Sequence, residues 1–300
     1  MSDDPILAFA ERQEWLAPIQ EKGEAIVKQA YNSGGETGQK LKNFMHGTWL
    51  GHPLHSAITD VPIGSWTAAA VLDVLEASGK PEYQAGADGA IAVGLVGAVG
   101  SAISGLTDWS EVHGKPQRVG ALHGLINVSA AALYGASYVA RKSQKRGLGR
   151  ALAFAGYGLV AAGAYLGGAI SYRQRIGVDH AANADEDLPR EFSPVIAEHE
   201  LVEGKPVKAN YQGTAIFLLK RGSEIFALGE ACSHLGGPLS EGEVTGDSVR
   251  CPWHGSRFCL RTGVVLDGPA VHPQPVLDVL LKDGQVFVKT SEETRTPAGY

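Results

Sequence analysis

Cysteine is scarce in this sequence, which holds three cysteines among 300 residues. So few thiols cannot supply the disulfide framework of a small secreted domain, and we expect a reducing compartment. Positive charge is also in short supply, because 26 lysines and arginines stand against 32 aspartates and glutamates. This acidic balance argues against a nucleic-acid partner.

A nucleotide fingerprint is absent as well. No Gly-x-Gly-x-x-Gly motif follows a predicted strand, so we expect no self-contained reductase that binds NAD(P)H or a flavin. Nor do we expect a signal peptide, because the first 30 residues are acidic and lack a continuous apolar stretch. Asp4-Pro5 instead predicts a helix start. The helix that follows places apolar side chains on one stripe, namely Ile6, Phe9, Trp15, Leu16 and Ile19.

Long apolar runs, by contrast, are abundant. They cover residues 56–76, 89–107, 120–140 and 151–171, and no sequence repeat is visible among them. Each run approaches the ~20 residues that an α-helix needs to cross a membrane. Glycine and alanine dominate the runs, and small residues let membrane helices approach closely. The sequence predicts a four-helix transmembrane bundle, with a buried soluble bundle as the alternative because Asp60 and Asp73 lie inside the first run.

Metal-binding residue types gather in two short boxes beyond these runs. Cys232 and His234 form a Cys-x-His box, and after sixteen residues Cys251 and His254 form a Cys-x-x-His box. Two thiolates and two imidazoles can hold zinc or a [2Fe–2S] cluster. Each box fits one tight loop, and the residues between them are numerous enough to form strands that bring the loops together. The spacing therefore predicts a metal centre and leaves both alternatives open.

The flanks of the boxes separate these alternatives. Residues 231–238 read Ala-Cys-Ser-His-Leu-Gly-Gly-Pro and residues 251–258 read Cys-Pro-Trp-His-Gly-Ser-Arg-Phe. Both resemble the boxes of the Rieske [2Fe–2S] domain, and Asp-Gly-Pro-Ala at 267–270 resembles its proline loop. The resemblance covers residues 192–290 and implies an all-β domain of the ferredoxin type. It also implies the cluster ligands, which are Cys232, His234, Cys251 and His254.

Departures from the family pattern are informative too. Ser256 matches a serine whose hydroxyl donates to a cluster sulfide, but Phe258 replaces a tyrosine donor. With one donor fewer, we expect a potential in the lower part of the family's range of about −150 to +300 mV. Gly237 and Trp253 occupy the positions of the disulfide found in cytochrome bc-type members, so that disulfide cannot form. We interpret Cys259 as a small buried apolar residue.

The predicted fold class is α plus β in separate domains. The domains are an N-terminal amphipathic helical segment (1–48), a four-helix transmembrane domain (49–175), an acidic linker (176–192), the Rieske domain (193–290) and a tail (291–300). The start of the first and third runs also resembles an uncharacterised bacterial family of four-helix membrane domains, DUF2231. Ten residues follow Thr290, too few for the second, iron-binding domain of a Rieske oxygenase. We expect an electron-transfer protein or oxidoreductase component rather than a self-contained enzyme.

Four spans would place both termini and the second-to-third connection on one membrane face, together with the Rieske domain. Six histidines outside the Rieske domain fall on that face: His46, His52, His55, His113, His123 and His180. Of these, His52, His55 and His123 stand at neighbouring helix starts, where imidazoles can ligate haem b iron or another metal. A quinone site and a purely interfacial role are the alternatives.

The functional expectation is therefore a membrane-bound Rieske protein that carries single electrons, relayed through a haem or quinone site in the bundle. In the alternative, the bundle only anchors a Rieske ferredoxin or docks a partner. The expected partners are a redox partner protein or quinone and the lipid bilayer. We expect a multi-pass protein of the cell's inner membrane with a cytoplasmic Rieske domain, because iron–sulfur domains are loaded before export and no export signal precedes the first span.

Overall fold

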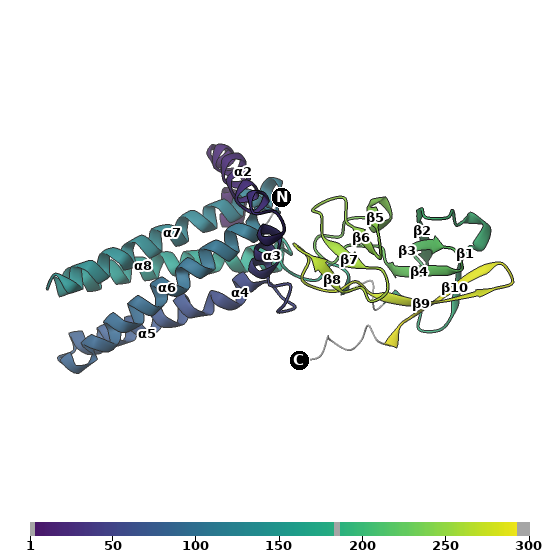
Figure 1. Ribbon diagram of the computed structural model, residues 1–300. Coiled ribbons are helices and arrows are strands. Elements are labelled where there is room, and N and C mark those ends of the chain that lie inside the picture. Colours follow the sequence, from purple (N-terminus) through teal and green to yellow (C-terminus); the bar gives the residue numbers. More distant parts are fainter. Residues whose placement is uncertain (1–3, 183–186, 293–300) are drawn as a thin grey trace. The chain divides into compact units, whose positions relative to one another are not determined.

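The computed structural model describes residues 4–182 and 187–292, and the chain divides into two compact units (Figure 1). The helical unit comprises Met1–Met45 and Pro53–Ile176, and the β unit comprises His46–His52 and Gly177–Tyr300. Helices and strands are thus segregated into separate units. This confirms the predicted fold class of a helical region followed by an all-β domain.

The helical unit begins with three helices that precede the long apolar runs. They are α1 (Pro5–Glu11), α2 (Ala17–Ser33), which follows the short 3-10 turn Glu14–Leu16, and α3 (Gly35–His46). The carboxylate of Asp4 caps α1 by accepting from the N–H of Ile6 at 2.9 Å and of Leu7 at 3.1 Å, as the sequence predicts. The predicted apolar stripe divides between environments, because Leu16 is buried whereas Phe9 and Trp15 are exposed.

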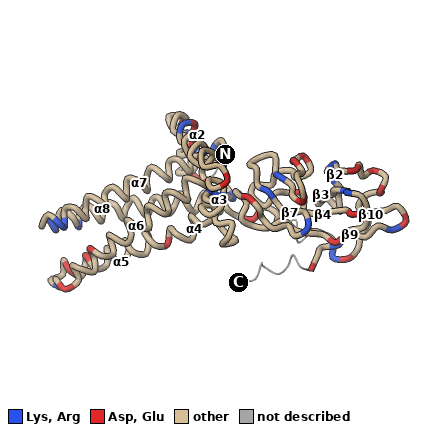
Figure 2. Tube along the Cα trace, viewed as in Figure 1, with Lys and Arg blue, Asp and Glu red and all other residues tan. Residues whose placement is uncertain are grey.

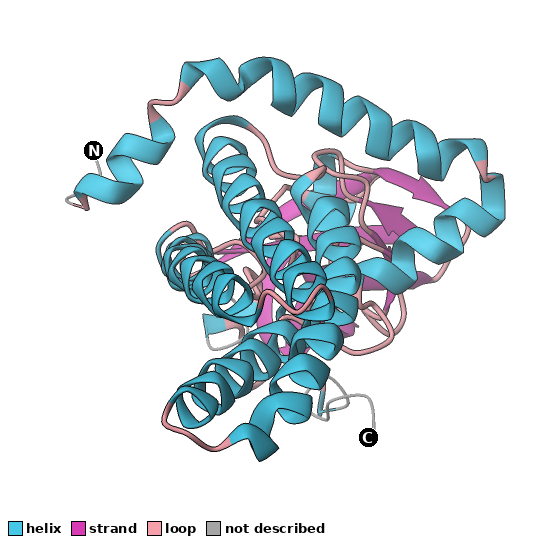
Figure 3. Ribbon diagram, turned by 90° about the vertical axis from the view of Figure 1, so that its left-hand side faces the viewer, coloured by secondary structure: helices cyan, strands magenta, loops and turns pink. Residues whose placement is uncertain are grey.

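The four predicted spans are present as long helical segments that lie side by side, and Figure 3 looks along them. They are α4 (Leu54–Ile58) with α5 (Asp60–Ala77), a 3-10 turn (Pro81–Tyr83) with α6 (Gln84–Trp109), α7 (Gly114–Lys142), and α8 (Arg146–Gly168) with a π-helical turn (Ala169–Arg173). All four segments are long and apolar enough to cross a membrane.

Apolar side chains cover the outside of these helices. Val71, Val96 and Val128 are 56%, 76% and 61% exposed. Figure 2 shows the charged residues of the long helices gathered toward their ends, with little charge along their length. A soluble bundle buries such side chains and places charge along its outer face. The surface therefore fits a lipid environment better than the soluble alternative.

An internal repeat relates the first pair of spans to the second. His55, Trp66 and Asp73 are each followed, 68 positions later, by His123, Tyr134 and Arg141. Each residue meets its own counterpart: the Trp66 and Tyr134 rings stack with centroids 4.1 Å apart, the two histidine rings lie 6.3 Å apart, and Asp73 pairs with Arg141. Contacts between equivalent residues indicate an approximate two-fold relation between the two helical hairpins. Of these three pairs only the histidines match in residue type, which makes the repeat inconspicuous in the sequence.

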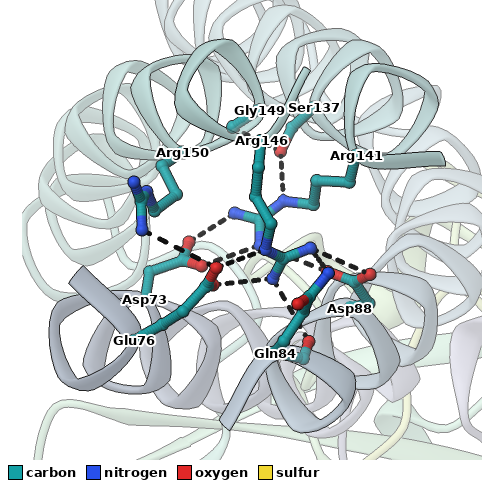
Figure 4. A network of polar contacts seen from close by, with 9 residues as sticks. All are labelled: Asp73, Glu76, Gln84, Asp88, Ser137, Arg141, Arg146, Gly149 and Arg150. Atoms are coloured by element: carbon teal, nitrogen blue, oxygen red, sulfur yellow. Dashed lines mark hydrogen bonds and ion pairs between the residues drawn. The ribbon is translucent and has the colours of Figure 1, made fainter. Parts of the chain in front are cut away.

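A network of buried ion pairs links the hairpins at the end of the bundle where the first and third spans finish (Figure 4). Both side chains of the Asp73–Arg141 pair are fully buried. Arg146 donates to Asp88 at 2.9 Å and to Glu76 at 2.7 Å. Arg150 also approaches Glu76. The network therefore holds three carboxylates and three guanidinium groups, namely Asp73, Glu76 and Asp88 with Arg141, Arg146 and Arg150. Charges buried between the helix ends are tolerated because each has a partner of opposite sign.

The β unit consists of two antiparallel sheets. The larger has the strand order β1-β10-β9-β4-β3-β2 and the smaller β5-β6-β7-β8. Their bounds are β1 (Ser193–Ala197), β2 (Pro206–Tyr211), β3 (Thr214–Arg221), β4 (Glu224–Gly229), β5 (Glu243–Thr245), β6 (Ser248–Arg250), β7 (Arg257–Cys259), β8 (Val265–Asp267), β9 (Val276–Lys282) and β10 (Gln285–Thr290). Side chains of both sheets, including Phe217, Leu228 and Phe258, form one buried core. The predicted all-β domain is therefore present.

Two segments pack differently from the predicted domain boundaries. Leu188, placed in the acidic linker, is 2% exposed and belongs to the β core, and the carbonyl of Pro189 accepts from the N–H of Thr290 at 2.7 Å. His46, placed in the N-terminal segment, is 1% exposed and belongs to the β unit, where it packs on Gly268. The polar composition of residues 176–192 predicted a linker, but Leu188 within it is apolar and is buried in the β core.

Candidate functional site

The two boxes form two loops with the same backbone design. The first loop follows β4 and the second connects β6 to β7. Cys232 N–H donates to the carbonyl of Gly237 at 2.8 Å, and Cys251 N–H donates to the carbonyl of Ser256 at 2.8 Å. In each loop the glycine four residues after the cysteine, Gly236 or Gly255, donates back to the cysteine carbonyl.

These glycines are required by the backbone. Gly236 has a φ of 77° and Gly255 a φ of 76°, a left-handed conformation that other residues adopt only with strain. The turn they make brings the histidine of each box to the same end of the loop as its cysteine. Local sequence therefore suffices to shape each half of the site.

The four side chains of the boxes come together as two pairs. Cys232 and Cys251 are 1% and 2% exposed and belong to the same buried cluster, and each thiol shifts the pKa of the other. The rings of His234 and His254 meet edge to face, with centroids 4.9 Å apart. Contact with the Cys232 thiol lowers the pKa of Cys251, because a thiolate there accepts a hydrogen bond.

This pairing distinguishes between the two kinds of metal centre. A tetrahedral zinc ion needs its ligands to converge on one point, and within residues 4–182 and 187–292 no three His, Cys, Asp or Glu side chains do so. A [2Fe–2S] centre needs a sulfur pair on one iron and a nitrogen pair on the other. The donor set fits the cluster.

Ser256 and Phe258 lie beside the second loop and are both fully buried. The Ser256 hydroxyl accepts from the N–H of Ala270, in the proline loop, at 2.9 Å. Its own proton is therefore left to donate elsewhere. Phe258 lies in the core and offers no donor, as its replacement of tyrosine implies.

Gly237 and Trp253, which occupy the positions of the disulfide in other members of the family, lie against each other. A side chain on Gly237 would begin 3.0 Å from the Trp253 ring and 2.8 Å from the Cys251 sulfur. Glycine thus admits the Trp253 ring against the first loop. Cys259, in β7, is a free thiol that is partly buried.

Gln274 holds the first loop in place and was not anticipated from the sequence. Its fully buried amide accepts from the N–H of Ser233 at 2.9 Å and donates to the carbonyl of Ala231 at 2.9 Å. The Ser233 hydroxyl donates to the carbonyl of His272 at 2.7 Å. Gln274 and Ser233 are 41 positions apart, so no local pattern could reveal the contact.

The predicted membrane histidines separate into two groups. His55 and His123 meet edge to face, with an interplanar angle of 85°. His52 is grouped with the β unit. The structure pairs His55 with His123, and the site of three histidines stays a prediction.

Comparison with known families gives the two units their assignments. Residues 191–285 match the family model of the Rieske [2Fe-2S] domain. Residues 51–180 match a predicted membrane protein family, DUF2231. The chain joins a Rieske domain to a DUF2231 membrane domain. With four apolar spans and this family match, the protein is membrane-localised.

Curated relatives of the Rieske domain include ferredoxins. The 3-phenylpropionate/cinnamic acid dioxygenase ferredoxin subunit of Photorhabdus laumondii is 38% identical over 100 residues, which are 33% of this chain and 94% of that protein. Ferredoxin CarAc of Metapseudomonas resinovorans is 34% identical over 31% of this chain and 89% of its own length. Human apoptosis-inducing factor 3 is 36% identical over 40% of this chain, but the match spans only 20% of that protein.

Among solved structures, the ferredoxin of carbazole 1,9a-dioxygenase from Nocardioides aromaticivorans IC177 is 25% identical, with a TM-score of 0.32. The match covers 33% of this chain and 98% of that ferredoxin. The Rieske domain with its ferredoxin relatives identifies an electron carrier that holds a [2Fe–2S] cluster. When bound, the cluster supplies a one-electron redox centre.

Proposed function

We propose that this protein is a membrane-anchored Rieske electron carrier in which Cys232 and Cys251 hold one iron while His234 and His254 hold the other. The observation that carries the assignment is the separation of the four side chains into a buried sulfur pair and an imidazole pair. The rest of the domain holds the two ligand loops in place. The left-handed glycines Gly236 and Gly255 shape the loops, and Gln274, just before β9, binds the backbone of the first loop.

Proton transfer accompanies electron transfer in this proposal. Each ligating imidazole keeps one ring nitrogen that is not bound to iron and can exchange a proton. With the cluster bound, Ser256 would donate its hydroxyl proton to a sulfide, which would favour the reduced state. Because Phe258 provides no second donor of this kind, the potential lies in the lower part of the family's range.

The electron is exchanged with a redox partner protein, by analogy with the ferredoxin subunits of dioxygenases among the relatives. The membrane bundle takes part in the path through a haem or quinone site, supported by the pairing of His55 with His123. In the competing view the bundle is only an anchor. The Rieske domain faces the cytoplasm, since its cluster is loaded there.

Metal and sulfide analysis of the full chain in detergent, together with electron paramagnetic resonance, tests the ligand assignment. Wild type is expected to contain equal amounts of iron and acid-labile sulfide and to give a Rieske signal on reduction. Cys251→Ser is expected to abolish the signal, whereas Cys259→Ser, the matched control in the same unit, keeps it. Zinc in place of iron, or a signal that survives Cys251→Ser, would overturn the assignment.

A further inference from the structure

We propose that His55 and His123 are the two axial ligands of a haem iron between the two related hairpins of the membrane bundle. This inference rests on the proposed function and names the group through which the bundle takes part in electron transfer. It begins from a juxtaposition: two identical side chains, from equivalent positions of the two hairpins, face each other in the bundle.

Both imidazoles are held in the same tautomer. Nδ1 of His55 lies 2.9 Å from the carbonyl oxygen of Ser101, and Nδ1 of His123 lies 2.9 Å from that of Gly163. Because a carbonyl can only accept, Nδ1 carries the proton and Nε2 keeps its lone pair. Histidines that bind metals are commonly oriented by such a bond from the other ring nitrogen.

Glycines give the two rings the same packing. A side chain on Gly105 would begin 2.7 Å from Nδ1 and Cε1 of His55. A side chain on Gly167 would begin 3.3 Å from Cε1 of His123. Each glycine lies four residues after the residue whose carbonyl holds the ring. The Nδ1 edge of each imidazole therefore rests on its own hairpin, and both rings are oriented before any metal binds.

The separation of the rings suits one metal between them. With metal–nitrogen distances of about 2 Å, imidazoles on opposite sides of one ion have ring centres roughly 6 Å apart. The observed separation is 6.3 Å. Among the described residues no third His, Cys, Asp or Glu joins the pair, so the pair lacks the further ligands that a tetrahedral zinc ion needs. A haem iron needs only two protein ligands because the porphyrin supplies the others.

Asn127 packs over the ring of the second histidine. Its amide nitrogen lies 3.1 Å from Nε2 and 3.4 Å from Nδ1 of His123, and it donates to the carbonyl oxygen of the same residue at 2.9 Å. Because it is close to both ring nitrogens, the amide lies against the face of the ring and does not occupy the in-plane lone pair of Nε2.

The electron count balances without a further reactant. One electron leaves the reduced cluster and converts ferric haem iron to the ferrous state, or passes in the reverse direction. Both centres exchange single electrons. The redox partner of the proposed function supplies or removes that electron.

A reduced-minus-oxidised absorption spectrum of the full chain, expressed with a haem supply and purified in detergent, tests this inference. We expect sharp haem bands, about one haem per chain, and a low-spin resonance of the strongly anisotropic kind that perpendicular imidazole planes produce. His55→Gln and His123→Gln are expected to lose the low-spin spectrum. His113→Gln, the control in the same unit, is expected to keep it.

The variants are backed by a titration of wild type with haemin, which needs no substitution. Saturation at one haemin per chain supports the site; no haem bands in purified wild type and no saturable uptake overturn it. Unchanged bands in both glutamine variants overturn it as well. The Rieske resonance is recorded on every sample. Wild type that holds the cluster but takes up no haem refutes this inference alone, whereas wild type without the cluster refutes the proposed function.

Discussion

Replacing Arg141 by alanine should destabilise the membrane bundle more than any change at an exposed ion pair. The guanidinium donates to Oδ1 of Asp73 at 2.7 Å and also contacts Oδ2, so it engages both carboxylate oxygens. Its Nε donates to the Ser137 hydroxyl at 3.1 Å. Both charged side chains are fully buried. Removing the arginine therefore leaves a buried carboxylate without its guanidinium.

The expected cost follows from that burial. Breaking a buried ion pair by removing one partner costs about 3–5 kcal/mol, because the remaining charge is desolvated without compensation. Arg150 provides the matched control: it lies 3.7 Å from Glu76 and its side chain is 29% exposed. Arg150→Ala should cost less, about 1 kcal/mol, because Arg150 is partly exposed and its contact with Glu76 is long, and Glu76 keeps Arg146 as a partner.

Unfolding of the detergent-solubilised protein in increasing SDS, followed by far-ultraviolet circular dichroism, measures these costs. A double-mutant cycle with Asp73→Ala isolates the pair, and the double variant should be less damaged than the sum of the single variants. The reasoning would be refuted by a loss for Arg141→Ala no larger than that for Arg150→Ala, or by additive effects in the cycle.

Two further predictions concern the Rieske site and the first helix. Ser256→Ala should lower the reduction potential by roughly 65–130 mV, because a hydrogen bond to a charged group contributes about 1.5–3 kcal/mol and 59 mV corresponds to a tenfold change. Protein-film voltammetry measures the potential, with Ser248→Ala as the control. An unchanged potential in Ser256→Ala would contradict the predicted donor. Hydrogen bonds from the Tyr165 hydroxyl and from the backbone hold the pKa of Asp4 below its usual value of 3.8, so its contribution to the docking of α1 is present above that pH and lost as the pH falls through the lower folded-state pKa. The protection factors of residues 5–11 against hydrogen exchange should therefore fall in acid in wild type and be low at every pH in Asp4→Ala, which lacks a capping oxygen. Equal protection in the two proteins would contradict the role of the cap.

Local patterns in the sequence predicted most of the architecture. The four spans depend on uninterrupted apolar runs, and the ligand loops on closely spaced residue types with left-handed glycines. Both signals are contained in fewer than about 25 neighbouring residues. For that reason the fold class and the pairing of the two boxes could be predicted before any coordinates.

What the sequence could not show depends on contacts between distant residues. Gln274 supports the first ligand loop from 41 positions away, and Leu188 joins a core that strands far from it build. The internal repeat was hidden because its paired positions differ in chemistry, with tryptophan against tyrosine and aspartate against arginine. Of the three membrane histidines, His52 packs with the β unit, a grouping that adjacency to His55 in sequence could not predict.

The repeat has a consequence for the biogenesis of the protein. His55 with its carbonyl and glycine partners lies wholly in the first hairpin, and His123 with its own partners lies in the second. A ribosome that has released only the first two spans has made half of the pair. The membrane site thus comes into being only after the fourth span has entered the bilayer. The ligand loops of the Rieske domain are synthesised after the fourth span, so the cluster site can form only after the membrane site. A chain truncated after the fourth span would therefore contain the membrane site without the cluster site.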